Sequence, residues 1–181
     1  MRKFKHLLRN FLSYIIDNKK TIIINYVVFL SLIFVLLLID LLTKQYLFDE
    51  NNLYQETLNN VTYQNWLFGI RSVDNPGLTF FGNATIDVVL VSTINIFILI
   101  VCLISLIFWK NILLSIFIAF IFSGSLGNTV DRLAFSYVRD IIFTPWLDKG
   151  TFNFADMDVI IGSFGFLITI LTLYLIPYFK K

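Results

Sequence analysis

Histidine and cysteine are almost absent from the sequence, which contains one of each. With a single histidine, a zinc site of the His-Glu-x-x-His type is excluded, and one thiol cannot build a metal cage. His6 precedes the first long apolar run, so it cannot activate a serine or cysteine nucleophile beyond that run. Cys102 lies within another apolar run and has no disulfide partner in the chain, so we expect a packed, inert thiol.

Charged residues are also scarce, at 14% of the chain. The stretch SGSLGN lacks the Gly-Lys-Ser/Thr ending of a phosphate-binding loop, and the basic residues gather at chain ends and turns rather than in a nucleic-acid-binding patch. We therefore expect no nucleic-acid partner, no metal and no cofactor.

Hydrophobic residues dominate instead, at 57% of the chain, with 17% aromatic residues and a mean hydropathy of +0.79. A helical membrane crossing needs about 20 apolar residues. Four runs approach or meet that length: Thr21 to Leu42, Val88 to Trp109, Ile112 to about Gly127, and Val159 to Tyr178. The composition predicts an all-α membrane protein with four transmembrane helices.

Basic residues predict the orientation of these helices. Nine of the 14 Lys and Arg lie before the first crossing, at Lys110 and at the C-terminal end. By the positive-inside rule, both termini are expected to be cytoplasmic and the loops 43–87 and 128–158 to lie on the outer side. Segment 1–20 is expected to be a basic amphipathic helix on the cytoplasmic membrane surface, followed by one four-helix unit over 21–181. The first run lacks a small-residue cleavage site after it, which favours a retained helix.

Carboxylates are the reactive groups that remain. The second outer loop contains Asp131, Asp140, Asp148, Asp156 and Asp158. Two carboxyl groups that face each other beside a bilayer cannot both ionise freely, as an aspartic hydrolase requires. If the fourth helix begins near Ala155, Asp156 and Asp158 differ by about 200° around its axis, so one of them is expected to be a helix-start acid. These residues alone leave open which acid completes a pair, and solvated loop acids remain the alternative.

Five motifs in this order resemble the bacterial lipoprotein signal peptidase family, signal peptidase II. They are DLLTK (40–44), NPGLTF (75–80), GSLGNTVDRL (124–133), YVRDII (137–142) and FNFAD (152–156). The resemblance implies a membrane aspartic endopeptidase that removes signal peptides from diacylglyceryl-modified prolipoproteins, cutting on the N-terminal side of the lipidated cysteine. It implies lipid-modified prolipoprotein signal peptides and membrane lipids as partners, and we expect a monomer.

The resemblance assigns Asp140 and Asp156 as the catalytic pair. Asp158 then becomes the helix-start acid. Asp131, which belongs to the third motif, is interpreted as structural and is the rival for the pair.

Supporting or substrate-binding roles also follow from the resemblance. The positions are Asp40, Lys44, Asn75, Gly77, Gly124, Asn128, Asp131, Arg132, Asn153 and Ala155. Asn128, Arg132 and Asn153 are expected to orient the carboxylates. Asp40 and Lys44 are four residues apart and are expected to form a helix-end pair that steadies the outer loop.

Small residues and turns complete the expected site. Asn75 and Gly77 bracket a proline in a tight turn that approaches the site. Gly124, Gly127 and Ala155 either let backbones approach closely or leave room for substrate.

Three features depart from the family pattern or extend it. Leu78 and Thr79 replace two alanines, and this change is expected to narrow or reshape the pocket. Arg139 precedes Asp140, and a neighbouring cation can lower a carboxyl pKa. The alternation in LNNVTYQNWLF (58–68) predicts short strands that clamp the substrate, with the cluster 66–68 at the membrane interface.

A small membrane carrier or proton-coupled channel that uses interfacial carboxylates is the alternative function. It would place acids deep within the helices, and the predicted crossings are almost free of them.

Overall fold

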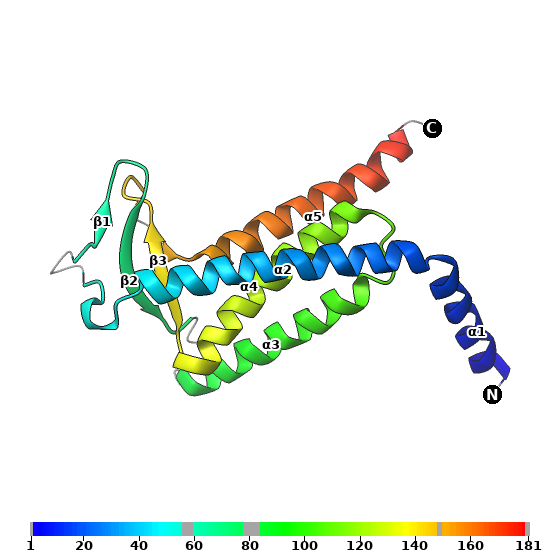
Figure 1. The fold of residues 1–181 in the computed structure, drawn as a ribbon, viewed down its shortest axis with the longest axis horizontal. Helices are drawn as coiled ribbons and strands as arrows, with labels where there is room; N and C mark the ends of the chain where they lie inside the picture. Colours follow the sequence, from blue (N-terminus) through cyan, green and yellow to red (C-terminus); the bar gives the residue numbers. More distant parts are fainter. Residues whose placement is uncertain (1, 56–59, 78–83, 148–149, 180–181) are drawn as a thin grey trace.

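The structure is a computed structural model that describes residues 2–55, 60–77, 84–147 and 150–179. Among these residues, four helices are long and apolar enough to cross a membrane, as predicted. They are α2 (Lys19–Leu47), α3 (Ala84–Ser105), α4 (Ile112–Phe135) and α5 (Phe154–Phe179). They form one bundle, with a small sheet at one end and a short helix, α1 (Arg2–Asp17), at the other (Figure 1).

The helix bounds differ from those predicted by apolar length. The third helix continues past Gly127 to Phe135 and ends where Ser136 adopts a left-handed conformation with φ 67°. Its last two turns are polar, but they remain helical because several of their side chains are buried against other elements. The second crossing ends at Ser105 rather than Trp109, and the fourth begins at Phe154, near the expected start.

Helix α4 is the centre of the bundle, because it packs against α2, α3 and α5. Phe29 of α2 is fully buried, and its ring meets Phe122 of α4 edge-on at 5.1 Å between centroids. Cys102 is buried in the same cluster, as expected. On the other side, Gly162 and Gly165 of α5 lie so close to α4 that a Cβ atom would overlap its residues. Helix packing in membranes favours such small residues.

The sheet has four antiparallel strands in the order β1-β2-β3-β4. They are β1 (Tyr63–Gln64), β2 (Gly69–Asn75), β3 (Val138–Phe143) and β4 (Thr151–Phe152). The prediction of short strands in the first outer loop is confirmed, but β2 lies after the segment proposed for them. The pairing of β2 with β3, in which Val73 faces Asp140, was not predicted. This pairing joins two loops that are far apart in sequence. The alternation of apolar and polar residues within one loop does not indicate which strand of another loop will pair with it.

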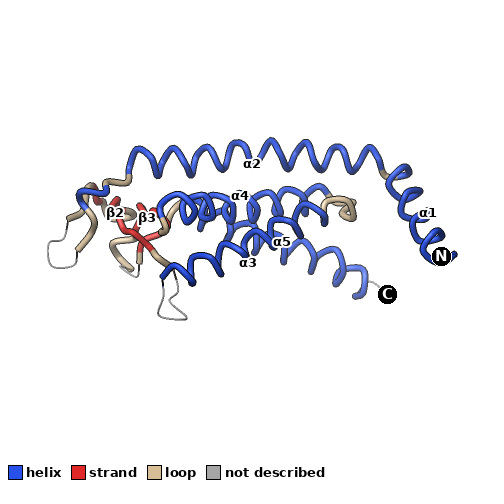
Figure 2. Tube along the Cα trace, turned by 90° about the horizontal axis from the view of Figure 1, so that it is seen from below, coloured by secondary structure: helices blue, strands red, loops and turns tan. Residues whose placement is uncertain are grey.

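Figure 2 shows the sheet beyond the ends of α2 and α4, and Figure 1 shows both chain termini at the opposite end of the bundle. Four crossings require the termini to share one side of a membrane, and the structure agrees. The cytoplasmic side for these termini stays a prediction, as does a membrane-interface position for Trp66, Leu67 and Phe68, which are exposed.

Candidate active site

Asp140 is buried in β3, with 1% of its surface exposed. Two amides hold its carboxyl group. Asn75 Nδ2 donates to Oδ2 at 2.8 Å, and Asn153 Nδ2 donates to Oδ1 at 2.7 Å. Burial raises the pKa of Asp140 to about 7, with an added upward effect of the Asp156 charge and an opposing effect of the two amides and Lys44. Asp140 can therefore carry a proton near neutral pH.

Asp156 lies in the first turn of α5, where it closes a reciprocal cap. Its backbone N–H donates to Asn153 Oδ1 at 2.9 Å, and the Asn153 N–H donates to Asp156 Oδ2 at 3.2 Å. This is the capping-box arrangement, built here from Asn and Asp. Asn128 Nδ2 donates to the other carboxylate oxygen at 2.8 Å. Both oxygens of Asp156 therefore accept hydrogen bonds, which hold the side chain in one orientation.

Asn153 connects the two aspartates. Its side-chain amide nitrogen donates to Asp140, while its backbone N–H and its side-chain oxygen bond to Asp156. The same amide nitrogen also lies 3.2 Å from Asn128 Oδ1, and that oxygen accepts from Lys44 Nζ at 3.1 Å. Asn128 and Asn153 were predicted to lie beside the two aspartates, and in the structure both hydrogen-bond to them.

A groove of about 540 Å³ lies between α3, α4 and α5, next to Asp156. Its polar lining residues are Asn95, Ser125, Asn128, Arg132, Asp156 and Ser163. Its other lining residues are Val91, Ile98, Ile121, Val159 and Ile160. The groove is therefore lined by both apolar and polar side chains, and Asp156 is one of the polar ones. Arg132, which was expected to orient the carboxylates, lines this groove and donates to the Asn128 carbonyl oxygen at 3.3 Å.

A buried network of ion pairs lies next to the two aspartates. Lys44 Nζ lies 2.8 Å from Asp40 Oδ2 and 3.3 Å from Asp131 Oδ2. Asp131 Oδ1 also accepts from Arg139 Nη2 at 2.8 Å, and its Oδ2 accepts from the Arg139 backbone N–H at 3.0 Å. Asp40 Oδ1 accepts from the Ala155 N–H at 2.9 Å. Two cations and two carboxylates thus tie α2, α4, β3 and α5 together without leaving a buried charge unpaired.

This network bears on two expectations. Asp40 and Lys44 do face each other, but the pair is fully buried and holds α4 and α5 rather than an outer loop alone. Asp131 has both carboxylate oxygens occupied by Lys44 and Arg139, which agrees with a structural role.

The pKa of Asp140 is raised rather than lowered, although Arg139 precedes it in the chain. Adjacent residues of a strand point to opposite faces, so Arg139 is directed to Asp131 while Asp140 faces Asn75 and Asn153. Burial and the Asp156 charge raise the pKa of Asp140, and together they outweigh the opposing effect of the Asn75 and Asn153 hydrogen bonds and the Lys44 charge.

The helix-start acid of α5 is Asp156, not Asp158 as expected. Asp156 occupies the first turn and makes the cap, whereas Asp158 is buried further along the helix. One carboxylate therefore has both roles that the sequence had divided between two. Asp156 is half-buried, and the cap uses only its Oδ2, while its Oδ1 accepts from Asn128 beside the groove.

Close packing, rather than room for substrate, explains two small residues. A Cβ atom on Gly124 would overlap the carbonyl oxygen of Ala155. One on Gly127 would lie 2.5 Å from Asp40 Oδ2 and 3.3 Å from Ala155 Cβ. Ala155 itself is fully buried at this crossing of α4 and α5.

The turn after β2 presents Asn75 to Asp140. Gly77 adopts a left-handed conformation with φ 87°, and its N–H donates to Asn75 Oδ1 at 2.9 Å. This leaves the Asn75 amide nitrogen to donate to Asp140. The turn thus approaches the site as expected, while Leu78 and Thr79, expected to narrow the pocket, lie outside the described residues.

Sequence reasoning missed the polar groove residues Asn95, Ser125 and Ser163. Asn95 Nδ2 donates to Thr129 Oγ1 at 3.3 Å across α3 and α4. The available signal was a polar side chain within a membrane-spanning run, which commonly marks a functional path. Among the described residues, no three His, Cys, Asp or Glu side chains are placed to hold a metal ion.

The fold and site define a multi-pass membrane protein. At one end of its helix bundle, two aspartates are linked by hydrogen bonds to the same asparagine, Asn153. The chain belongs to the signal peptidase (SPase) II family, whose model matches residues 32–172. This confirms the family suggested by the five motifs, and it agrees with a bacterial membrane protein.

Relatives named lipoprotein signal peptidase match parts of the chain. The match to the *Enterococcus faecalis* (strain ATCC 700802 / V583) protein is 34% identical over 53 residues, covering 29% of this chain and 33% of the relative. The match to the *Clostridium tetani* (strain Massachusetts / E88) protein is 39% identical over 62 residues, covering 33% and 40%. The chain therefore aligns with less than half the length of these relatives.

Two solved chains described as bacterial membrane enzyme structures share the fold. One has a TM-score of 0.63 at 24% identity, covering 80% of this chain and 87% of that one. The other has a TM-score of 0.64 at 23% identity, covering 79% and 92%. At this level of identity, the likeness concerns the fold alone.

Proposed function

We propose that the chain is a membrane aspartic endopeptidase that removes signal peptides from diacylglyceryl-modified prolipoproteins. The cut falls on the N-terminal side of the lipidated cysteine. The observation that carries the proposal is the connection of Asp140 and Asp156 through Asn153, which hydrogen-bonds to both carboxyl groups. Membership of the signal peptidase II family supports the substrate class.

The two carboxyl groups have different roles in this proposal. Asp140 is buried and its pKa is raised to about 7, so it holds the proton that the departing amine receives. Asp156 borders the groove and takes a proton from the attacking water. Water adds to the scissile carbonyl, the C–N bond breaks, and no covalent intermediate forms. Asn128 and Asn153 orient the carboxyl groups throughout.

Arg132 and the groove suggest how the substrate is held. The apolar walls from α3 and α5 suit a signal peptide that enters sideways from the bilayer, with its scissile bond beside Asp156. Apolar contact adds little net energy against lipid, so recognition depends on shape and hydrogen bonds. Arg132 and Asn95 are positioned to bond to polar parts of the substrate near the cut.

The test is cleavage of a diacylglyceryl-modified prolipoprotein in detergent, followed by gel shift. Asp140→Asn and Asp156→Asn should each lower the rate at least about a hundredfold, because each removes a positioned acid or base. Asp131→Asn is the comparison with a buried carboxylate of α4 that lies outside the proposed pair. Retained cleavage in either of the first two variants would overturn the pair. A parent protein that is inactive on the lipidated substrate, but conducts protons or carries ions in vesicles, would favour a carrier or channel.

A further inference from the structure

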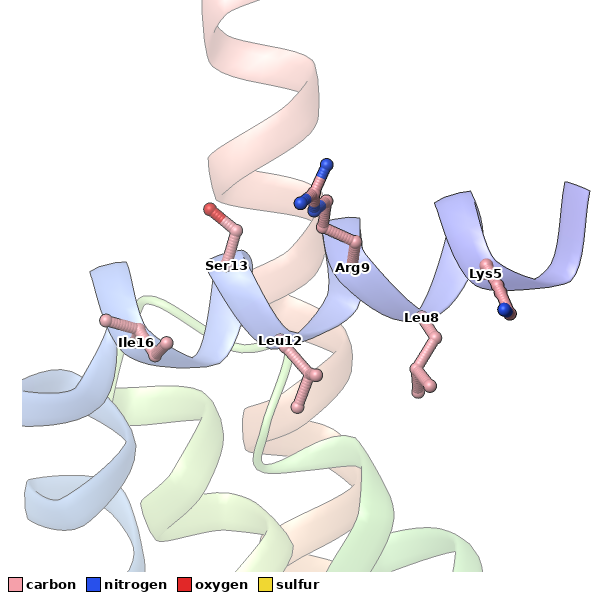
Figure 3. A pocket seen from close by; sticks show the side chains of 6 residues that line it. All are labelled: Lys5, Leu8, Arg9, Leu12, Ser13 and Ile16. Atoms are coloured by element: carbon pink, nitrogen blue, oxygen red, sulfur yellow. The ribbon is translucent and has the colours of Figure 1, made fainter. Parts of the chain in front are cut away.

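Helix α1 is amphipathic, and the structure leaves its apolar face uncovered. Its exposed apolar residues are Phe4, Leu7, Leu8, Phe11, Leu12 and Ile16. At 100° per residue these positions fall on one side of a helix. Figure 3 shows Leu8 and Leu12 on one side of α1, with Arg9 and Ser13 pointing the opposite way. The family match begins only at residue 32, so α1 lies outside it.

In the part of the chain that the structure describes, the C-terminal half of α1 contacts the turn between α3 and α4. The Tyr14 hydroxyl lies 3.4 Å from the carbonyl oxygens of Ile107 and Phe108, in the turn between α3 and α4. The Tyr14 and Phe108 rings stack at 6.3 Å between centroids, and Phe11 lies 6.4 Å from the same ring. These contacts hold the end of α1 at the edge of the bundle while the rest of the helix stays exposed.

The position of α1 is suited to a membrane surface. Asn18 separates it from the membrane-spanning α2, and Figure 1 shows α1 turned away from the α2 axis at the end opposite the sheet. In Figure 3, Leu8 and Leu12 point to the side on which the spanning helices lie. Residues of α2 such as Ile23 and Val27 are exposed too, so lipid would surround the spanning helix that follows α1.

The charge of this segment indicates which kind of surface it meets. Residues 1–20 contain six basic side chains and one acidic side chain. The basic residues are Arg2, Lys3, Lys5, Arg9, Lys19 and Lys20, and the acidic one is Asp17. Two such segments would repel each other, whereas anionic lipid headgroups attract them.

We propose that α1 is an interfacial helix that binds anionic lipids of the leaflet at its end of the bundle, the leaflet predicted to be cytoplasmic. Its apolar face enters the headgroup and acyl boundary, as in other amphipathic helices. Its basic side chains contact lipid phosphates. The Tyr14 contacts then fix the depth of the α3–α4 turn relative to that surface.

Two neighbouring positions about 100° apart around the helix provide the test, one on the apolar face and one beside it. Leu8→Cys and Arg9→Cys, each in a Cys102→Ala background, are labelled with an environment-sensitive fluorophore in the full-length chain. The chain is reconstituted in phosphatidylcholine vesicles with and without phosphatidylglycerol. The label at position 8 should be protected from aqueous iodide and quenched by spin-labelled lipid, while the label at position 9 should remain open to iodide. Equal iodide quenching at both positions would overturn the proposal.

Charge removal tests the anionic part of the proposal. Lys3→Gln and Lys5→Gln should each weaken the phosphatidylglycerol-dependent protection at position 8 about fivefold. Each basic residue near an anionic membrane surface strengthens binding to that surface by about this factor. Protection that is the same without phosphatidylglycerol would overturn the assignment of anionic lipids. Protection that grows with protein density at constant lipid composition would show a second copy on this face instead. Unchanged thermal unfolding of each labelled variant confirms that the bundle is intact.

Discussion

Asn153 and Asp156 cap α5 reciprocally, each accepting a hydrogen bond from the backbone N–H of the other. The carboxylate proposed to activate water is thus also part of the start of a spanning helix. Because Asn153 additionally donates to Asp140, the geometry of the proposed pair depends on the same residue that begins α5.

The dual role of Asn153 can be separated by substitution. Asn153→Ala should lower stability by about 1 kcal/mol through loss of the cap, and should reduce cleavage about tenfold to a hundredfold through loss of the bond to Asp140. Asn153→Ser should restore the cap but not the cleavage rate, because a serine hydroxyl is too short to replace the amide. Thermal unfolding in detergent and the gel-shift assay measure the two effects. Full activity in Asn153→Ser would show that the bond to Asp140 is dispensable.

The raised pKa of Asp140 predicts a pH-dependent stability. The folded pKa of about 7 is above the unfolded value near 3.8, so folding favours the protonated form. The contribution of Asp140 to the free energy of unfolding is complete below about pH 4 and is lost as pH rises towards 7. The total loss is roughly 4 kcal/mol at most. Thermal unfolding across this range should show the decline in the parent. Asp140→Asn, which cannot ionise, should lack this part of the decline, and an identical pH profile in both proteins would contradict the burial argument.

The same pKa predicts the alkaline limb of activity. If Asp140 must be protonated to serve the leaving amine, kcat/KM should fall as pH rises above about 7. Initial rates of cleavage at fixed detergent and substrate concentration measure this limb. A rate that keeps rising well above pH 7 would exclude Asp140 as the acid.

Arg139 should stabilise the fold without tuning the proposed pair. In Arg139→Met, Lys44 is the one cation among the described residues that is still paired with the buried Asp131. We therefore expect the free energy of unfolding to fall by about 3 kcal/mol or more. Arg139→Lys should recover only part of it, since an ammonium cannot reproduce both guanidinium bonds. The alkaline limb of cleavage should stay in place in both variants. A shift of about one pH unit would show that the Arg139 charge acts on Asp140.

Gly127 tests the close crossing of α4 and α5. A Cβ atom there would lie 2.5 Å from Asp40 Oδ2 and would crowd Ala155. Gly127→Ala should therefore cost about 1 to 3 kcal/mol of stability, as overpacking does. Leu133→Ala, at an exposed position on the same helix, is the matched control and should have little effect. If Gly127→Ala unfolds at the parent temperature, the Asp40 carboxylate has room to move.

Local patterns in the sequence were sufficient for the crossings, whereas the assignment of most of the proposed site came from the family resemblance. Apolar runs near the length of a bilayer predicted four helices, because lipid leaves the backbone few alternatives. The motif order brought Asp140, Asp156, Asn128 and Asn153 together before any coordinates. The polar continuation of α4 to Phe135 was missed because apolar length cannot report polar side chains that are paired inside a bundle.

The sequence by itself determined the membrane class, the number of spanning helices and the residue types available for chemistry, since these depend on composition and local order. Only the tertiary structure decided the partners. It paired β2 with β3, directed Arg139 to Asp131 and away from Asp140, and gave Asp156 rather than Asp158 the helix cap. Pairing between distant segments depends on how strands register and helices cross, and one residue of register reverses which face a side chain occupies.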